Sequence, residues 1–193
     1  DFLTEKGVLE DSFFHISDEP GLDHLETYHA LWRFVKPMLR GRPIMDAISN
    51  VDFYKHGLID IPVSATDHIE PFLREPVENQ WVYYCCGEYK AVGNRFLAFP
   101  EYRNRILGVQ LFKFDIKGFL QWGYNFYHTD RSMYVIDPYL TSSGDGMVPS
   151  GDPFSVYPGK DGPVASLRAL NFKDALQDVD ILKALAQRTS HEH

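Results

Sequence analysis

Two adjacent carboxylic acids, Asp18 and Glu19, follow an apolar segment and precede Pro20 in the run FFHISDEP. Two carboxylates this close cannot both ionise at low cost, so one of them is expected to hold a proton near neutral pH. A protonated acid at the end of a strand is what protonation of a glycosidic oxygen requires. Acids before Pro and Gly are also an ordinary way to begin a helix, at its positive N-terminus. By themselves, the two acids leave both interpretations open.

Short apolar runs alternate with amphipathic stretches, the pattern typical of parallel strands joined by helices. Five strands are expected, too few to close a barrel, and they cover residues 12–17, 43–49, 58–65, 81–86 and 118–126. Four helices are expected over residues 22–39, 66–74, 101–115 and 172–188. The acid pair then lies at the carboxyl end of the first strand. Long segments rich in turn residues, 87–100 and 127–170, follow strands and are expected to be functional loops at the mouth of a barrel.

Composition bounds the class of protein and its partners. The chain has 193 residues, of which 44% are hydrophobic and 24% charged, as in soluble globular proteins. A net charge of -8 and the lack of Lys/Arg runs argue against a nucleic-acid partner. No apolar run is long enough for a membrane span. Because the chain begins with Asp in what resembles a helix end, we expect upstream sequence of the same polypeptide.

The sequence predicts neither a metal nor a cofactor. Cys85 and Cys86 are neighbours in an apolar run, where two buried thiols on a strand are the simplest interpretation. Asp137, Asp145 and Asp152 could supply oxygen ligands to Ca²⁺, but their spacing matches no EF-hand loop and favours solvated turns. The histidines are scattered without ligand spacing.

Three segments, in chain order, carry a family resemblance: FFHISDEP, GFLQWGYNFY and GDPFSVYPGKDGPVASLRALNFKDALQDVDIL. Together they resemble the signature segments of glycoside hydrolase family 123 over nearly the whole chain. The resemblance implies a (β/α)8 TIM-barrel catalytic domain, often preceded by a β-sandwich. Residues 1–193 would then be the C-terminal part of that domain, supplying strands four to eight of an incomplete barrel whose upstream strands are absent from this chain.

The resemblance also implies an enzyme that releases terminal β-linked N-acetylhexosamine, most specifically N-acetylgalactosamine, from a glycan or glycoconjugate with retention. The 2-acetamido oxygen of the sugar attacks the anomeric carbon in this substrate-assisted reaction. Carried onto matching positions, Glu19 is the general acid/base and Asp18 orients the acetamide N–H. Since consecutive strand residues point to opposite faces, the backbone must turn at Asp18 for both acids to serve one ring.

Five further residues are expected to line the sugar site. On the last strand, Trp122 is a candidate wall for the sugar, with Tyr124 beside it and Asn125 as a hydroxyl contact; packing in the barrel core is the competing interpretation for Trp122. Tyr84 and Glu88, at the end of the WVYYCCGEY strand, are candidate hydroxyl ligands, although Glu88 could equally be a solvated loop acid.

Two other functions stay open. In a two-carboxylate retaining glycosidase, Glu19 would be the acid/base and Glu88 the nucleophile. A non-catalytic carbohydrate-binding barrel would need neither. Arg168 could pair with an acid in the closing helix, and Arg95 could cover the sugar or face water. An extracytoplasmic location is suggested by the resemblance alone, and the compartment is otherwise open.

Overall fold

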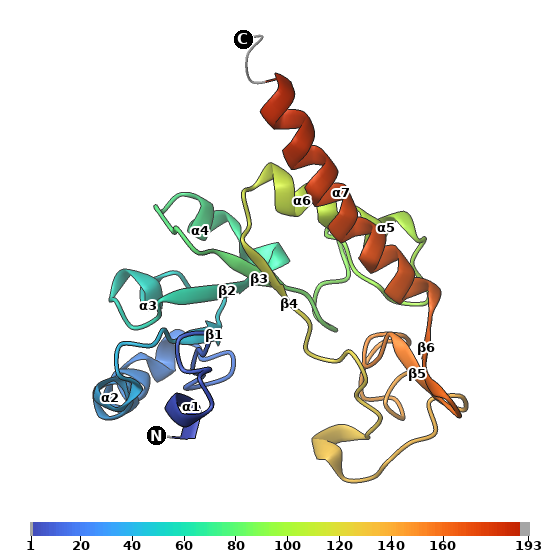
Figure 1. Ribbon diagram of the computed structural model, residues 1–193. Coiled ribbons are helices and arrows are strands. Elements are labelled where there is room, and N and C mark those ends of the chain that lie inside the picture. Colours follow the sequence, from blue (N-terminus) through green and yellow to red (C-terminus); the bar gives the residue numbers. More distant parts are fainter. Residues whose placement is uncertain (1, 190–193) are drawn as a thin grey trace. The chain divides into compact units, whose positions relative to one another are not determined.

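The computed structural model describes residues 2–189, and its contacts divide the chain into two compact units (Figure 1). The first unit contains the residues up to Tyr83 together with Lys117–Leu120. The second contains Tyr84–Ile116 and the residues that follow Leu120. Within the described residues, no helix is both long and apolar enough to cross a membrane.

The first unit is built on a four-stranded parallel sheet whose strands lie in chain order. The strands are β1 (Met45–Ala47), β2 (Ile61–Ala65), β3 (Trp81–Tyr83) and β4 (Gly118–Leu120). Because all four are parallel, their carboxyl ends meet at one edge of the sheet, where ligands bind in parallel α/β proteins.

The first unit also contains short helices, several of which contribute buried side chains to its core. They are α1 (Phe2–Glu5), η1 (Leu22–His24), α2 (Leu25–Val35), η2 (Lys36–Leu39), α3 (Asp52–Lys55), η3 (Thr66–His68) and α4 (Glu70–Leu73). Tyr28 on α2 packs edge-on against Phe53 on α3, with ring centroids 5.2 Å apart. Both side chains are buried in one apolar cluster, and such a pair adds about 1 kcal/mol to the free energy gained by burial alone.

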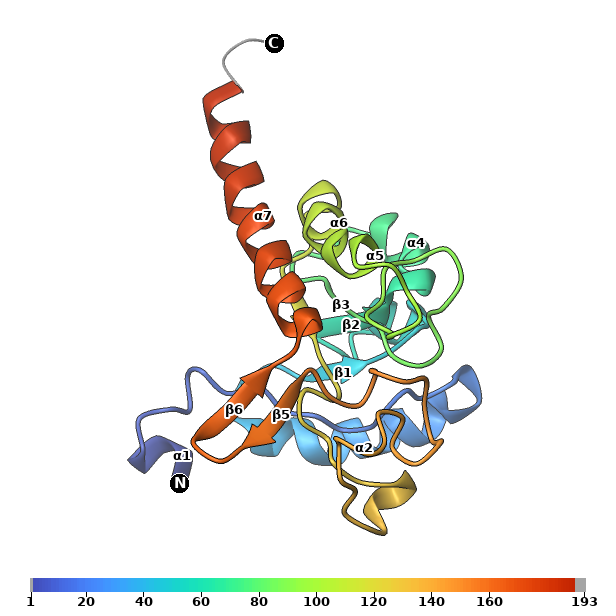
Figure 2. The same cartoon turned by 90° about the vertical axis from the view of Figure 1, so that its right-hand side faces the viewer.

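The second unit combines helices with a two-stranded hairpin. Its elements are α5 (Tyr102–Arg105), α6 (Leu107–Lys113), η4 (Asp130–Ser132), β5 (Val156–Gly159), β6 (Gly162–Ala165) and α7 (Leu167–Thr189). Figure 2 shows the antiparallel β5–β6 hairpin leading directly into the long helix α7. Helices α6 and α7 approach closely at Gly108, where an added Cβ would lie 2.0 Å from the carbonyl oxygen of Ala175.

The observed strands are shorter than the expected ones, and the sheet has four strands, not five. The expected strand at 12–17 is reduced to a single parallel bridge between Phe14 and Ile44. The strand expected at 118–126 ends at Leu120. The expected loop at 127–170 contains the β5–β6 hairpin, because Lys160 and Asp161 form a turn between two short extended segments. The result is a mixed α/β fold compatible with part of an α/β domain.

Candidate active site

The acid pair lies in the first unit, with both side chains exposed to solvent. The backbone turn that two neighbouring acids require is present, but at Glu19, whose φ of 45° is in the left-handed region. Residues without glycine's freedom adopt this conformation at a cost of about 1 kcal/mol or more, which the surrounding contacts must offset. The Glu19 N–H donates a hydrogen bond of 3.1 Å to the carbonyl oxygen of Ala47, at the end of β1. The backbone of Glu19 is therefore attached to the sheet edge.

Tyr83, the last residue of β3, holds the side chain of Glu19. Its hydroxyl donates a hydrogen bond to Glu19 Oε1, and the ring is 5% exposed. A buried ring leaves the hydroxyl little freedom, so the Glu19 carboxyl is fixed at one oxygen while the side chain stays accessible. Sequence reasoning missed Tyr83, although its position at the carboxyl end of an apolar strand was a usable signal.

A buried acid, Asp46 in the middle of β1, contacts the segment that precedes the acid pair. Its carboxylate accepts hydrogen bonds from the Ile16 N–H at 2.9 Å and from the Tyr28 hydroxyl. His15 Nδ1 also contacts this carboxylate. Burial raises the pKa of Asp46 above its ordinary value, against the opposing effect of these hydrogen bonds and of His15. Asp46 lies within the strand expected at residues 43–49, but the sequence analysis gave it no function.

Trp122, in the second unit, is held by a buried ion pair. The indole Nε1–H donates to Asp152 Oδ1 at 3.3 Å, and Asp152 Oδ1 lies 3.7 Å from a guanidinium nitrogen of Arg95. Arg95 also donates to the backbone carbonyls of Asp152 and Gly123. Asp152 is fully buried, and burial raises its pKa to about 6 although Arg95 opposes the shift. Arg95 thus neither faces water nor stands free to cover a sugar.

Tyr124 and Asn125 follow Trp122 and are both exposed. The Tyr124 carbonyl accepts a 2.8 Å hydrogen bond from the Ser155 N–H, and Asn125 forms an antiparallel bridge with Phe154. These backbone contacts hold the segment in place and leave its side chains accessible, as the prediction of sugar contacts requires.

Tyr84 and Glu88 are buried in the second unit. The Tyr84 hydroxyl donates to Asn104 Oδ1 at 3.2 Å, and burial raises the pKa of this phenol strongly. Glu88 is 6% exposed, and its Oε2 accepts a 2.6 Å hydrogen bond from the Cys85 N–H. These contacts give both side chains a structural role, and their contact with a sugar stays a prediction.

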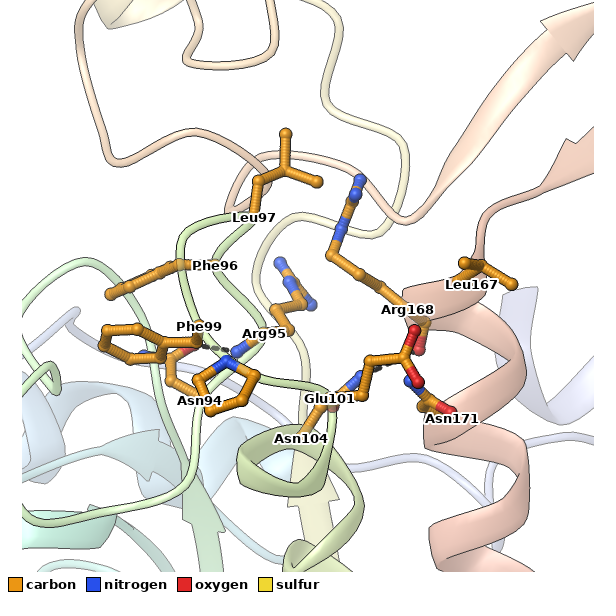
Figure 3. Close-up of a pocket in the computed structure, with 11 residues that line it drawn as sticks. Asn94, Arg95, Phe96, Leu97, Phe99, Glu101, Asn104, Leu167, Arg168 and Asn171 are labelled. Atoms are coloured by element: carbon orange, nitrogen blue, oxygen red, sulfur yellow. Dashed lines mark hydrogen bonds between the residues drawn. The ribbon is translucent and has the colours of Figure 1, made fainter.

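A pocket of about 230 Å³ lies within the second unit, at the start of α7 (Figure 3). Arg95 and Arg168 lie side by side in it, and burial, together with the nearby charge of Arg168, lowers the pKa of Arg95 below its ordinary value. Arg168 donates to the Phe154 carbonyl at 2.8 Å, which gives it a backbone partner within the second unit. Glu101 also lines the pocket, so charged side chains of both signs surround it. In the described part of the chain, no three His, Cys, Asp or Glu side chains are grouped so that they could hold a metal ion.

Comparison with known proteins gives a family and a related fold. Residues 1–185 match the sequence pattern of the glycoside hydrolase 123 catalytic domain. A family 123 glycoside hydrolase from Clostridium perfringens, described for the hydrolysis of glycolipid glycans, has a similar structure with a TM-score of 0.76 and 20% sequence identity. The similarity covers 98% of this chain and 34% of that protein, so the chain spans about a third of its length. Among curated proteins, none matches the sequence.

The family match covers nearly the whole chain and includes the acid pair, the Trp122 segment and the hairpin region that carried the resemblance. The chain belongs to the catalytic domains of glycoside hydrolase family 123.

Proposed function

We propose that the polypeptide containing this chain removes terminal β-linked N-acetylhexosamine, with N-acetylgalactosamine as the preferred sugar, by substrate-assisted catalysis with retention. The observation that carries the proposal is the geometry of the acid pair. Asp18 and Glu19 are both exposed, and the left-handed backbone at Glu19 breaks the alternation that would send two neighbouring side chains to opposite faces.

In the first step, the 2-acetamido oxygen attacks the anomeric carbon as the glycosidic bond breaks. Glu19 gives its proton to the leaving oxygen, and Asp18 accepts the acetamide N–H, which stabilises the positive charge that develops there. In the second step, Glu19 as carboxylate takes a proton from water, which opens the oxazolinium ring with net retention. Asp18 needs no proton in either step, so the two acids have different roles.

Tyr83 supports this division of roles. A hydroxyl that donates to Glu19 Oε1 leaves Oε2 as the oxygen that exchanges a proton with the substrate. It also limits the rotamers of a side chain that must approach the glycosidic oxygen to within about 3 Å. Preorganisation of this kind lowers the cost of reaching the transition state.

The two-carboxylate alternative receives less support from the contacts of Glu88. A nucleophile must present a carboxylate oxygen to the anomeric carbon, yet Glu88 is 6% exposed and accepts a hydrogen bond from the Cys85 N–H. We therefore assign Glu88 to the internal structure of the second unit, within the same proposal. Trp122, Tyr124 and Asn125 remain our proposed contacts for the sugar ring and its hydroxyls.

We also propose that residues 1–193 form the C-terminal part of one (β/α)8 barrel and supply its strands four to eight. The four parallel strands in chain order support this, because a barrel orders its strands in that way. The bridge at Phe14 marks where the first of the five strands would lie.

Kinetics on matched aryl glycosides test the function. We expect the intact natural polypeptide to hydrolyse an aryl β-N-acetylgalactosaminide at least about a hundredfold faster than the aryl β-galactoside that lacks the 2-acetamido group. A thiazoline that mimics the oxazoline intermediate should inhibit competitively, with a Ki well below KM. Equal rates on both glycosides, or no inhibition by the thiazoline, would contradict the substrate-assisted route.

A further inference from the structure

The segment that precedes the acid pair begins as a regular neighbour of β1. The Phe14 N–H donates to the Pro43 carbonyl and the Met45 N–H donates to the Phe14 carbonyl, both at 2.9 Å. In a parallel ladder that continued from this bridge, the Ile16 N–H would donate to Met45 and the Asp18 N–H to Ala47. The hydrogen bonds observed at Ile16 and at the Ala47 carbonyl are different ones.

A side chain takes the place of the first missing bond. The Ile16 N–H donates instead to Asp46 Oδ1 at 2.9 Å. The backbone returns to β1 only at Glu19, whose N–H donates to the Ala47 carbonyl at 3.1 Å. The segment therefore carries one residue more than β1 between the two attachments, which is the definition of a bulge. Glu19 occupies the position that Asp18 would hold in an unbroken ladder.

The bulge determines how the acid pair can act. In an unbroken strand, neighbouring side chains leave on opposite faces, and only one of the two acids could reach a given sugar ring. The extra residue and the φ of 45° at Glu19 remove that restriction. Whatever maintains the bulge therefore also maintains the relative orientation of the two acids.

Asp46 is the group placed to maintain it. Its carboxylate is fully buried and connects the segment to α2: the Ile16 N–H and His15 Nδ1 contact Oδ1, and the Tyr28 hydroxyl of α2 donates to Oδ2. A buried carboxylate in a strand is costly, and an apolar residue there would let the ordinary ladder form.

From this geometry we infer that Asp46 is a positioning residue for Glu19: it replaces a ladder hydrogen bond at Ile16, keeps the bulge, and so orients the general acid. The inference rests on the proposed function, in which Glu19 protonates the leaving group. Asp46 itself touches no substrate in this account and acts only through the backbone of residues 16–19.

The test is leaving-group dependence in the intact natural polypeptide. A general acid contributes about 10²–10⁴-fold when the leaving group is poor and little when it is activated. We expect Asp46→Ala to lower kcat/KM, which reports the step in which the leaving group departs, by at least about a hundredfold on an alkyl glycoside and by less than about tenfold on a 2,4-dinitrophenyl glycoside. Asp46→Asn keeps the acceptor for Ile16 and should restore most of kcat/KM on the alkyl glycoside.

Two further variants separate positioning from stability. If Asp46→Ala does not fold, the double variant Tyr28→Phe/Asp46→Leu makes both buried partners apolar, keeps the core packed and still lacks the acceptor for Ile16. Asp60→Val is the matched control, because Asp60 Oδ2 also accepts a strand N–H, that of Ile44 at 2.8 Å, just before β1 begins. It should lower the midpoint of thermal unfolding without any leaving-group-dependent loss of kcat/KM.

The outcomes are distinguishable from a failure of the proposed function. If Glu19→Gln shows no greater loss of kcat/KM on the alkyl glycoside than on the dinitrophenyl glycoside, Glu19 is not the general acid, and both the function and this inference are wrong. If Glu19→Gln behaves as a general-acid variant but the folded Asp46 variants lose activity equally on both substrates, or lose none, only the positioning role of Asp46 is overturned.

Discussion

The buried ion pair of the second unit gives a stability prediction for Arg95→Met. Arg95 is 3% exposed, donates to the backbone carbonyls of Gly123 and Asp152, and lies 3.7 Å from Asp152 Oδ1. Methionine has an apolar side chain of similar length, so it fills much of the same space but makes none of these interactions. Breaking a buried pair on one side costs about 3–5 kcal/mol, because the remaining charge stays buried without compensation. We expect a loss of unfolding free energy of that size at about pH 8.

The pH dependence follows from Asp152. Burial raises its pKa to about 6 in the folded chain, from an ordinary value of 3.8. As the pH falls, the folded state takes up this proton first, so protonation favours folding. The contribution is fully present below 3.8 and is lost as the pH rises through about 6. Each pKa unit corresponds to about 1.4 kcal/mol, which makes the effect on the order of 3 kcal/mol.

Removal of Arg95 should make the unfolding free energy depend more strongly on pH, because the Arg95 guanidinium lowers the pKa of Asp152. At about pH 5 Asp152 is mostly neutral, so the deficit of Arg95→Met relative to the natural sequence should shrink by about 1.4 kcal/mol or more. Urea unfolding followed by tryptophan fluorescence at both pH values measures it. The control is Arg95→Met/Asp152→Asn, which should lose the extra dependence. An equal deficit at both pH values would refute a charge interaction between the two residues.

Three more predictions concern other parts of the chain. Tyr83→Phe removes the donor to Glu19 and should lower kcat by about 10- to 100-fold with KM nearly unchanged, as steady-state kinetics would show; an altered KM alone would contradict it. Gly108→Val should destabilise the second unit by at least about 3 kcal/mol, since its Cβ would lie 2.0 Å from the Ala175 carbonyl, and an unchanged thermal midpoint would disprove close α6–α7 packing. Glu88→Ala should cost about 1–3 kcal/mol of stability by removing the buried hydrogen bond that Glu88 accepts from the Cys85 N–H, measured by urea unfolding beside Glu88→Gln, which keeps an acceptor and should be milder.

Much of the first unit could be predicted from local sequence. The apolar runs around Ile61–Ala65 and Trp81–Tyr83 identify strands because neighbouring residues on both faces are buried. The run at residues 12–17 has the same appearance, yet it forms only one bridge, because the carboxylate of Asp46 takes the next ladder position. This replacement of a backbone acceptor by a side chain joins residues 30 positions apart in the chain, so no local sequence pattern predicts it.

In the site, too, local features could be predicted from the sequence and contacts between distant residues could not. Asp18 and Glu19 are adjacent, so the sequence shows them together, and the family match covers them. The partners of the site are far apart in the chain: 64 residues separate Tyr83 from Glu19, and Arg95 meets the backbone of Asp152 from 57 residues away. Composition placed Asp152 in an acidic, Gly- and Pro-rich segment typical of solvated turns. Its burial follows from the tertiary contact with Arg95, which the local composition does not encode.

The most direct test of the account compares Asp18→Asn, Glu19→Gln and Glu88→Gln in the intact natural polypeptide, with kcat/KM measured on one aryl β-N-acetylgalactosaminide. Substrate-assisted catalysis predicts that the first two variants each lose at least about a hundredfold, while Glu88→Gln stays within about tenfold of the natural sequence. If Glu88→Gln abolishes turnover and Asp18→Asn is mild, Glu88 is the nucleophile and the central claim is wrong.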